Sequence, residues 1–594
     1  MTPPAGHGSR DQDSTARRLP RGYLLAQIWR FVRPHQRLLW FGLALLFLNV
    51  GARLGQPWLM KTAIDDFLLD EEQTGFVWLL VGYLGLAVVE WLGRRGQLLA
   101  LERAGQSTLL DLRIEVFRHL QRLPMRFFDR TPVGRLVGRA TTDIEALQEL
   151  FSSGLVTVLG DIVFLAVAVG ILVSLDLELA LASLASVPVF LAATIFVRRF
   201  ARKAYTELRT RLSQMNADLH EQVSGMEVVQ LFGQEEQSAH RFSDSNQGLR
   251  SAQLRSVRWE SVLSALTEMI ASITTAVVLW VGGRSVLGLD GDEVLSIGTL
   301  YAFVDYMRQM FVPLTDLSLR YTVFQNGMIA GDRIFGLLKE EPESPDPAEP
   351  AVSEGAGVVE FDAVGFGYDP SRPVLSGFNL RVAPGERVAL VGATGAGKST
   401  VLNLLTRLYE IDSGAIRLDG ADIREMARQD LRRRVGVVTQ DVFLFSGSIL
   451  DNIRLARPDT SDEEAIRAAE ELGLGEIVKR FPNGYYEPVA ERGRNLSAGE
   501  RQLIAFARVL VAQPDVIALD EATSNVDAET ESILQRALHR VMANRTSLVI
   551  AHRLATVREA DRIVVIGGGE VLETGRHEDL VQAGGAYAEL DRLR

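Results

Sequence analysis

The 594-residue sequence contains no cysteine, which excludes disulfide bonds, thiol catalysis and metal sites built on cysteine. Lysine is also scarce, because only five of the 63 basic residues are lysines. The formal net charge of −12 gives no reason to expect nucleic acid as a partner. Residues 1 to 22 lack the apolar core of a secretory signal, and they are polar and proline-bearing. We expect them to form a disordered cytoplasmic tail.

The apolar residues are concentrated in the first half of the chain. Stretches near the length that a helix needs to cross a bilayer occupy residues 37–60, 76–98, 153–175, 177–198, 260–283 and 294–316. Buried helices of a large soluble protein are the alternative, but six such stretches before a polar half favour a membrane protein. The fold class predicted for residues 23–337 is a membrane α-helical bundle of six transmembrane helices.

Charged residues between these stretches predict the orientation of the bundle. The short loops at 65–75, 175–178 and 284–293 carry mostly Asp and Glu, with Arg284 as the only basic residue, so they should face outward. Residues 99–150 and 199–258 are rich in arginine and in good helix formers. They should form long cytoplasmic extensions of the helices, with chain reversals near 125–135 and 224–235.

Two segments flank this bundle. Residues 23–36 mix aromatic, aliphatic and basic side chains, which favours an elbow helix at the membrane surface, although a simple extension of the first span fits as well. Residues 338–357 include an acidic, proline-rich stretch and should form a linker. Residues 358–594 should then form a second, separately folded domain.

Five charged residues lie within the predicted spans: Glu90, Asp161, Glu268, Asp305 and Arg308. Charges are costly inside a membrane and usually face a cavity. Interhelical ion pairs or positions at the membrane edge explain them equally well, so we do not assign them to a binding site.

The first motif in the second half that indicates a chemical function is GATGAGKST at residues 392–400. Closely spaced glycines let backbone N–H groups wrap a triphosphate at the start of a helix, where the helix dipole favours anions. Lys398 adds a positive charge, and Ser399 adds a hydroxyl ligand for Mg²⁺. The candidate ATP-binding residues here are Gly392, Thr394, Gly395, Ala396, Gly397, Lys398, Ser399 and Thr400, and they predict an α/β P-loop NTPase domain.

A second acidic motif follows an apolar strand at residues 516–519. Asp520 and Glu521 stand at its carboxyl end, which is where ligands bind in open α/β sheets. Asp520 should hold Mg²⁺ through water, and Glu521 should orient and polarise the attacking water. An acidic pair after a strand is usually just solvated, but the phosphate loop ahead of it favours the catalytic interpretation.

With LSAGERQ at 496–502 and ALDEATS at 518–524, the chain resembles the ABC transporter family over nearly all its length. The resemblance implies an ABC-type cassette that binds ATP and Mg²⁺ and pairs head to tail with a second cassette. In that arrangement Ser497, Ala498, Gly499 and Glu500 act in trans, on ATP held by the partner. A single cassette implies a half-transporter.

Further positions match the family. The resemblance implies that Tyr368 stacks on adenine, that Gln440 contacts Mg²⁺ and water, and that His552 contacts the γ-phosphate, which makes Glu521, His552 and Gln440 the catalytic set. Mg²⁺ would be held by Ser399, Gln440 and Asp520, and Ser524 and Asp527 would form the D-loop. Taken alone, Tyr368 is equally well an ordinary strand-end aromatic, and His552 a packed side chain.

In the family, short coupling helices occupy the tips of the cytoplasmic extensions and press into grooves on the cassettes. Phe127, Phe128 and Phe232 lie at these tips, among polar residues, and suit such docking. Packing between neighbouring helices is the competing explanation.

The signature departs from the common LSGGQ at two positions. Ala498 adds a side chain where close backbone approach is needed, and Glu500 adds negative charge near the nucleotide. Both changes should weaken the contact in trans. We therefore expect a heterodimer, in which the alteration affects only the site built on the partner's phosphate loop; a homodimer is the alternative. LSAGERQ beside an intact DEATS resembles the catalytically competent half of bacterial heterodimeric multidrug exporters, and this resemblance implies a partner whose own cassette has a degenerate ATP site.

The resemblance implies ATP-driven efflux of small hydrophobic or amphipathic compounds by alternating access. A lipid flippase and an ATP-gated channel or regulator remain alternatives. The expected location is the cytoplasmic membrane, in contact with its lipid, with the cassette and the N-terminus in the cytoplasm.

Overall fold

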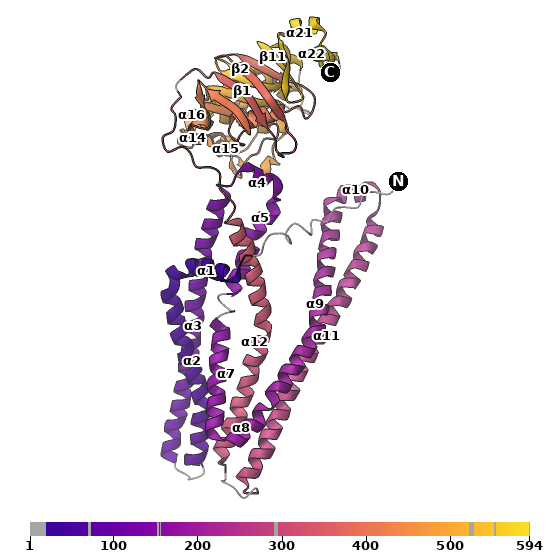
Figure 1. Ribbon diagram of the computed structural model, residues 1–594. Helices are drawn as coiled ribbons and strands as arrows, with labels where there is room; N and C mark the ends of the chain where they lie inside the picture. Colours follow the sequence, from indigo (N-terminus) through magenta and orange to yellow (C-terminus); the bar gives the residue numbers. More distant parts are fainter. Residues whose placement is uncertain are drawn as a thin grey trace. The chain divides into compact units, whose positions relative to one another are not determined.

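The computed structural model describes residues 19–68, 73–150, 154, 156–289, 295–353, 355–521, 528–551 and 554–592. It divides into two compact units, and each is described by itself (Figure 1). The first comprises Met1–Gln121 and Val133–Glu340, and the second comprises Arg122–Pro132 and Glu341–Arg594. Most of the predicted tail, residues 1–18, lies outside the described residues.

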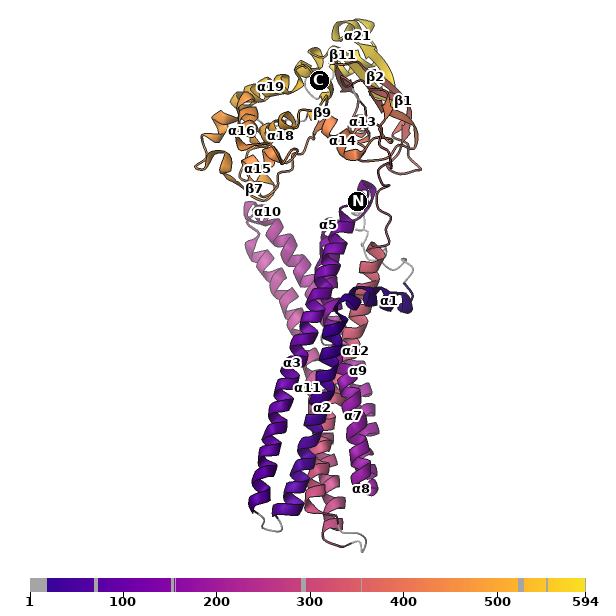
Figure 2. The same ribbon diagram turned by 90° about the vertical axis from the view of Figure 1, so that its left-hand side faces the viewer.

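The first unit is helical. Its elements are α1 (Arg21–Val32), a 3₁₀ turn (Arg33–His35), α2 (Gln36–Thr62), a π-helical turn η2 (Ala63–Leu68), α3 (Gln73–Leu120), α5 (Val133–Ala140), α6 (Thr142–Glu149), α7 (Val156–Leu175), α8 (Leu177–Leu184), α9 (Ser186–Ser224), α10 (Met226–Leu231), α11 (Glu235–Val286) and α12 (Ile297–Leu337). The helices α2 and α3 lie side by side, and α9 and α11 run together and are joined at one end by α10 (Figures 1 and 2).

Five helices in the described residues are long and apolar enough to cross a membrane: Gly22–Phe67, Gly75–Leu120, Val156–Leu175, Leu177–Ser224 and Glu235–Val286. Four of them contain the predicted spans 37–60, 76–98, 177–198 and 260–283, and Val156–Leu175 covers the predicted span 153–175 from residue 156 onward. The sixth predicted span, 294–316, falls on α12 from residue 297 onward. Large apolar side chains on these helices point outward, among them Trp78, which is 76% exposed, and Trp280, which is 71% exposed. This is the surface expected of helices that face lipid.

Short helices stand at both predicted chain reversals. The helix α4 (Met125–Arg130) lies within 125–135, and α10 lies within 224–235, which confirms that the chain turns there. At the opposite ends of the helices, Asp176 alone separates α7 from α8, and its carboxylate caps α8 by accepting a hydrogen bond from Leu179 N at 2.7 Å.

Two of the charged residues in the predicted spans, Glu90 and Asp161, have polar partners on neighbouring helices. Gln56 of α2 donates to Glu90 of α3 at 2.7 Å, and Arg320 of α12 lies 3.9 Å from Asp161 of α7. Asp305 accepts from Gln309 on its own helix at 3.0 Å. Glu268 and Arg308 are exposed. For Glu90 and Asp161 the structure therefore favours contacts between helices.

The second unit contains α4 and an α/β domain. Its strands are β1 (Val359–Phe366), β2 (Leu375–Val382), β3 (Arg387–Val391), β4 (Ser413–Leu418), β5 (Ala421–Asp422), β6 (Val435–Val438), β7 (Gly447–Ser448), β8 (Pro488–Val489), β9 (Val516–Glu521), β10 (Thr546–Ala551), β11 (Arg562–Gly567) and β12 (Glu570–Gly575). Its other helices are α13 (Lys398–Leu405), α14 (Arg428–Arg434), α15 (Ile449–Arg454), α16 (Asp462–Glu471), α17 (Leu474–Val478), α18 (Ala498–Ala512), α19 (Ala528–Met542), α20 (Leu554–Arg558), α21 (His577–Ala583) and α22 (Ala586–Arg592).

Two larger sheets organise this domain. One has the order β12-β11-β3-β10-β9-β6 and is parallel except for β12, and the other is the antiparallel sheet β2-β1-β4-β5. The central strand β10 is buried at all six positions, as parallel strands covered on both faces are. One apolar core lies between the sheets and α13, and a second lies around α15, α16, α18 and α19.

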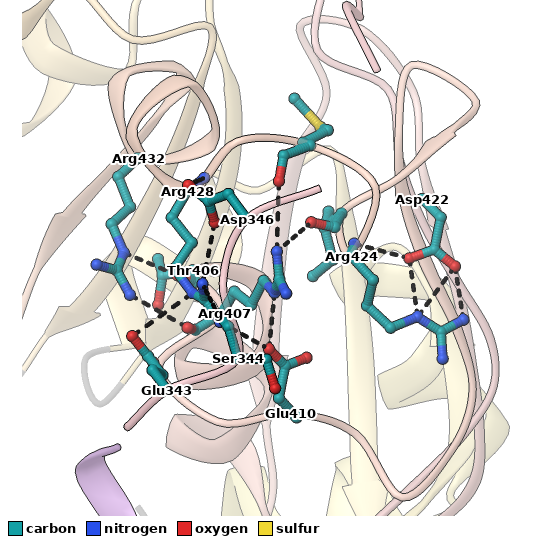
Figure 3. A network of polar contacts seen from close by, with 12 residues as sticks. Glu343, Ser344, Asp346, Thr406, Arg407, Glu410, Asp422, Arg424, Arg428 and Arg432 are labelled. Atoms are coloured by element: carbon teal, nitrogen blue, oxygen red, sulfur yellow. Dashed lines mark hydrogen bonds and ion pairs between the residues drawn. The ribbon is translucent and has the colours of Figure 1, made fainter. Parts of the chain in front are cut away.

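A network of arginines binds residues 343–346 to this domain (Figure 3). The Arg428 guanidinium donates to Ser344 O at 2.6 Å and to Asp346 at 2.9 Å, and it lies 3.6 Å from Glu343. It also contacts Glu410 at 3.2 Å, a carboxylate that it shares with Arg407. The segment that leads from α12 into the cassette is thus fixed to the cassette before β1 begins.

Candidate functional site

Four neighbouring parallel strands end at one edge of the larger sheet. The register places Ile550 of β10 opposite Leu390 of β3, and Ala551 opposite Glu521 of β9, while Val438 of β6 pairs with Leu519. The phosphate loop follows β3, Asp520 and Glu521 end β9, and Gln440 follows β6 as an exposed residue. The fold therefore brings the predicted motifs to the carboxyl edge, where ligands bind in open α/β sheets.

The loop of residues 392–397 is closed around the ammonium group of Lys398. Lys398 Nζ donates to Gly392 O and to Ala393 O, each at 2.9 Å, and the side chain is only 8% exposed. Gly397 precedes α13 with φ +98°, a left-handed conformation that suits glycine. A positive charge and the start of a helix thus lie at the same place, as an anion site requires.

Gly392 has no room for a side chain. A Cβ there would lie 2.3 Å from Ile566 O, a backbone atom of the neighbouring strand β11, and 3.3 Å from Ala396 Cβ. We expect Gly392→Ala to destabilise the domain by about 1–3 kcal/mol, the usual cost of overpacking, and to displace the loop. Thermal unfolding with and without ATP measures both effects. Gly475→Ala is the control, because its Cβ would meet its neighbours at an ordinary 3.4 Å, and an equal loss there would contradict the argument.

Oxygen ligands suitable for a divalent cation adjoin the loop. Ser399 Oγ donates to Asp520 Oδ2 at 2.8 Å. Asp520 Oδ1 is buried and accepts no hydrogen bond from any residue that the structure describes. Hydroxyl and carboxylate oxygens are the ligands that Mg²⁺ prefers, so these residues fit that ion.

His552, Ser524 and Asp527 lie outside the described residues, and for Glu521 only the backbone is described. The strand β9 nevertheless fixes the Cα of Glu521 at the same sheet edge as the phosphate loop.

Tyr368 lies just beyond β1 and is 37% exposed. Its ring makes edge-to-face contacts with Phe366 at 5.0 Å and with Tyr409 at 5.1 Å between centroids. Its hydroxyl lies 3.3 Å from Thr400 Oγ1 and accepts from Asn403 Nδ2 at 3.3 Å, and both residues belong to α13. An exposed aromatic ring is therefore held beside the helix that follows the phosphate loop.

The signature residues form the start of α18. Ser497 caps the helix, accepting from Glu500 N at 3.3 Å, and Glu500 in turn accepts from Ser497 N at 2.7 Å. Ser497 and Ala498 are exposed, whereas Gly499 is buried. The pattern Ser-x-x-Glu is the sequence signal of such a capping box, so this pairing could have been read from the sequence.

The helix α4 contacts residues around Tyr368 through polar side chains. Arg126 donates to Gly367 O at 3.0 Å and reaches Asp412 at 3.4 Å, with its guanidinium 5.4 Å from the centre of the Phe366 ring. Tyr409 donates to Asp129 at 2.9 Å. Sequence reasoning missed these residues, because the Asp129–Tyr409 contact spans 280 positions and neither residue belongs to a motif.

The aromatic residues at the two predicted tips differ in exposure. Phe127 and Phe128 are half-buried and pack edge to face against each other, 5.6 Å apart. Phe232, at the end of α10, is 73% exposed. Its docking on a partner cassette stays a prediction.

Comparisons with known proteins agree with this architecture. Residues 39–314 match the ABC transporter transmembrane region, and residues 375–524 match the ABC transporter domain. A probable multidrug resistance ABC transporter ATP-binding/permease protein of Bacillus subtilis is 37% identical over 88% of this chain and 77% of its own length. A fatty acid ABC transporter ATP-binding/permease protein of Mycobacterium bovis is 37% identical over 86% of this chain and 79% of its own.

Among solved structures, a bacterial Atm1-family ABC exporter with ATP bound is similar, with a TM-score of 0.74 and 29% sequence identity. The match covers 93% of this chain and 97% of that one, so the whole order of membrane helices and α/β domain is shared.

Proposed function

Because the chain belongs to the ABC transporter family and is an exporter that couples ATP hydrolysis to transport, we propose that it expels hydrophobic or amphipathic compounds as one half of a heterodimer. ATP hydrolysis by this domain is supported by the position of Lys398, Ser399 and Asp520, which lie close together at one edge of the sheet. The chain is a multi-pass membrane protein. We place its cassette on the cytoplasmic side, because arginine-rich segments between spans, such as 99–150 and 199–258, are usually retained on that side.

In this proposal the triphosphate of ATP occupies the loop of residues 392–400. Lys398 Nζ turns from its two carbonyl acceptors to the phosphate oxygens, which offer it stronger, charge-assisted bonds. Ser399, Gln440 and Asp520 would hold Mg²⁺, and the bound ion would neutralise part of the phosphate charge. Tyr368 offers its exposed ring to adenine.

Hydrolysis demands that a water be aligned with the γ-phosphate, since phosphoryl transfer depends on positioning and electrostatic stabilisation. Glu521 stands at the end of β9 for this task, directly after Asp520. We assign the γ-phosphate contact to His552, which follows β10 in the sequence. Ser524 and Asp527 complete the cassette–cassette contact as the D-loop.

The signature supports a heterodimer. The Glu500 carboxylate is tied to the N-terminus of α18, next to Ser497, whose hydroxyl should meet the γ-phosphate of the partner's ATP. A fixed negative charge there opposes the phosphate, and Ala498 adds bulk at the exposed start of the helix. Pairing with a different subunit confines this weakness to one site, where the partner supplies the phosphate loop.

The substrate class rests on relatives. One relative is named as a probable multidrug resistance transporter and another as a fatty acid transporter, and a fatty acid is amphipathic. A lipid with an acyl chain is the second candidate, favoured by the fatty acid relative.

Partner dependence tests the proposal. The full chain in lipid should show Mg-ATPase activity at least about tenfold higher when co-purified with a subunit that lacks the glutamate equivalent to Glu521, because only then is one ATP site completed by an unaltered signature. Steady-state phosphate release at saturating ATP measures this. Efflux of an amphipathic dye from cells expressing both subunits checks transport in the same pair.

Two results would contradict the proposal in different ways. Full activity of the chain alone, with no second subunit present, would establish a homodimer. ATPase activity that drives no movement of any amphiphile against a gradient would favour a channel or regulator over a pump.

A further inference from the structure

The first coupling helix, α4, contacts the cassette on both sides of Tyr368. Arg126 bonds the carbonyl of Gly367, the residue directly before Tyr368, and its guanidinium approaches the ring of Phe366. Asp129, three positions along, binds the hydroxyl of Tyr409, whose ring packs edge to face against Tyr368. The helix α4 thus contacts the backbone next to Tyr368 and also the residue that packs against the Tyr368 ring.

Tyr409 is itself held in place by the segment after α13. Arg407 has a positive φ of 53° and is 5% exposed, and it donates to Ile423 O and Met426 O at 3.3 Å (Figure 3). Arg432 binds the carbonyls of Thr406 and Arg407 at 3.3 and 3.2 Å. These hydrogen bonds fix the backbone of the turn that precedes Tyr409. The orientation of the Tyr409 ring then depends on its packing and on the hydrogen bond to Asp129.

The aromatic contacts form a closed set. Phe366, Tyr368 and Tyr409 contact one another edge to face, with centroids 5.0 to 5.7 Å apart. Such arrangements are favoured over face-to-face stacking because of the ring quadrupoles. Two of the three residues are contacted by α4: Arg126 approaches the Phe366 ring, and Asp129 accepts a hydrogen bond from the Tyr409 hydroxyl.

We propose that Tyr409 is a positioning residue for the nucleotide base: Asp129 of α4 fixes its hydroxyl, and its ring fixes Tyr368 in the orientation that stacks on adenine. The inference rests on the proposed role of Tyr368. If Tyr409 has this role, the affinity for the adenine base depends on the first coupling helix, whereas the affinity for the phosphates does not.

Two further observations agree with this role. Burial, and then the hydrogen bond to the Asp129 carboxylate, raise the pKa of Tyr409 well above its ordinary value, so the hydroxyl remains a donor at any physiological pH. Tyr368 is also bound to α13 through Thr400 and Asn403. Coupling of this kind is reciprocal, so a base stacked on Tyr368 should in turn favour the conformation in which Asp129 meets Tyr409.

Steady-state ATPase kinetics of the full chain in lipid, with its partner subunit, test the inference on Tyr409→Phe, Asp129→Ala and the double variant. Each single variant should raise the KM for ATP about fivefold and leave kcat within about twofold, as expected when one hydrogen bond to a charged group is lost but acts only through a neighbouring ring. The double variant should match the singles, because the two groups form one interaction.

A ribose triphosphate that lacks the base separates positioning from a general structural effect. Its KM should be the same for wild type and Tyr409→Phe, since no ring stacks on Tyr368. Tyr486→Phe is the matched control, because its hydroxyl also donates to an aspartate, Asp462, at 3.0 Å in the same cassette. That variant should behave as wild type with both substrates.

The outcomes are distinct. Equal increases for both substrates, additive effects in the double variant, or a KM for ATP that does not change would overturn the inference. If Asp129→Ala does not reach the membrane, Tyr409→Phe carries the comparison between the two substrates, because it removes the same hydrogen bond from the other side. A wild-type pair that hydrolyses no ATP would instead refute the proposed function, whatever the variants do.

Discussion

Replacing Glu521 by glutamine should lower kcat for ATP hydrolysis by about 10²- to 10⁴-fold, the range that a positioned acid–base group contributes. The amide keeps the size of the side chain and its place at the end of β9, but it cannot polarise the attacking water. Strand pairing with β10 fixes the backbone there, so the substitution should not disturb the fold. ATP binding should persist, because the phosphate loop and Asp520 are unchanged.

Single-turnover phosphate release and equilibrium ATP binding, measured on the same preparation, distinguish these effects. Glu570→Gln is the control, since Glu570 is exposed on the edge strand β12 of the same sheet. Residual activity above about a tenth of wild type would remove Glu521 from its assigned role. Loss of ATP binding together with activity would point to a structural defect.

Lys398→Ala should weaken ATP binding by roughly 100-fold, equivalent to about 2.7 kcal/mol. The expectation follows from the loss of charge-assisted hydrogen bonds, each of which contributes about 1.5–3 kcal/mol. Without nucleotide the same change leaves Gly392 O and Ala393 O without their ammonium donor, so the loop should also lose order. Binding and loop order should therefore decline together.

Equilibrium binding of a fluorescent ATP analogue and amide exchange across residues 392–400 measure the two effects. Lys479→Ala is suited as a control because Lys479 is an exposed lysine of the same domain and the chain has few others. An affinity within about threefold of wild type for Lys398→Ala would show that the backbone N–H groups alone hold the triphosphate.

The parts of this protein that the sequence predicts well are those whose chemistry depends on short spacings. The glycines of the phosphate loop precede α13, and Asp520 follows a buried strand, so both motifs meet once the parallel sheet forms. The apolar stretches likewise predict the membrane helices, since bilayer thickness determines their length. The single residue Asp176 between α7 and α8 ends one helix and caps the next.

Contacts between distant parts of the chain were not predictable in the same way. Arg126, Asp129 and Tyr409 are ordinary residue types at positions with no recurring pattern, and only the fold brings them together. The sequence indicated that aromatic residues would dock the tip at 125–135, whereas the hydrogen bonds come from the charged residues beside Phe127 and Phe128. Charged side chains are usually solvated, so a charged residue in the sequence does not indicate which residue it contacts in the fold.

The arginine network at residues 343–346 determines where the chain can be cut to obtain an autonomous recombinant cassette. Arg428 is almost buried, with an 11% exposed side chain, and most of its acceptors lie on this short stretch. A fragment that starts at residue 358 keeps only Glu410 as a carboxylate partner and leaves much of a buried cation uncompensated. A fragment that starts at Glu341 retains the whole network and is the natural choice for crystallisation of the isolated domain.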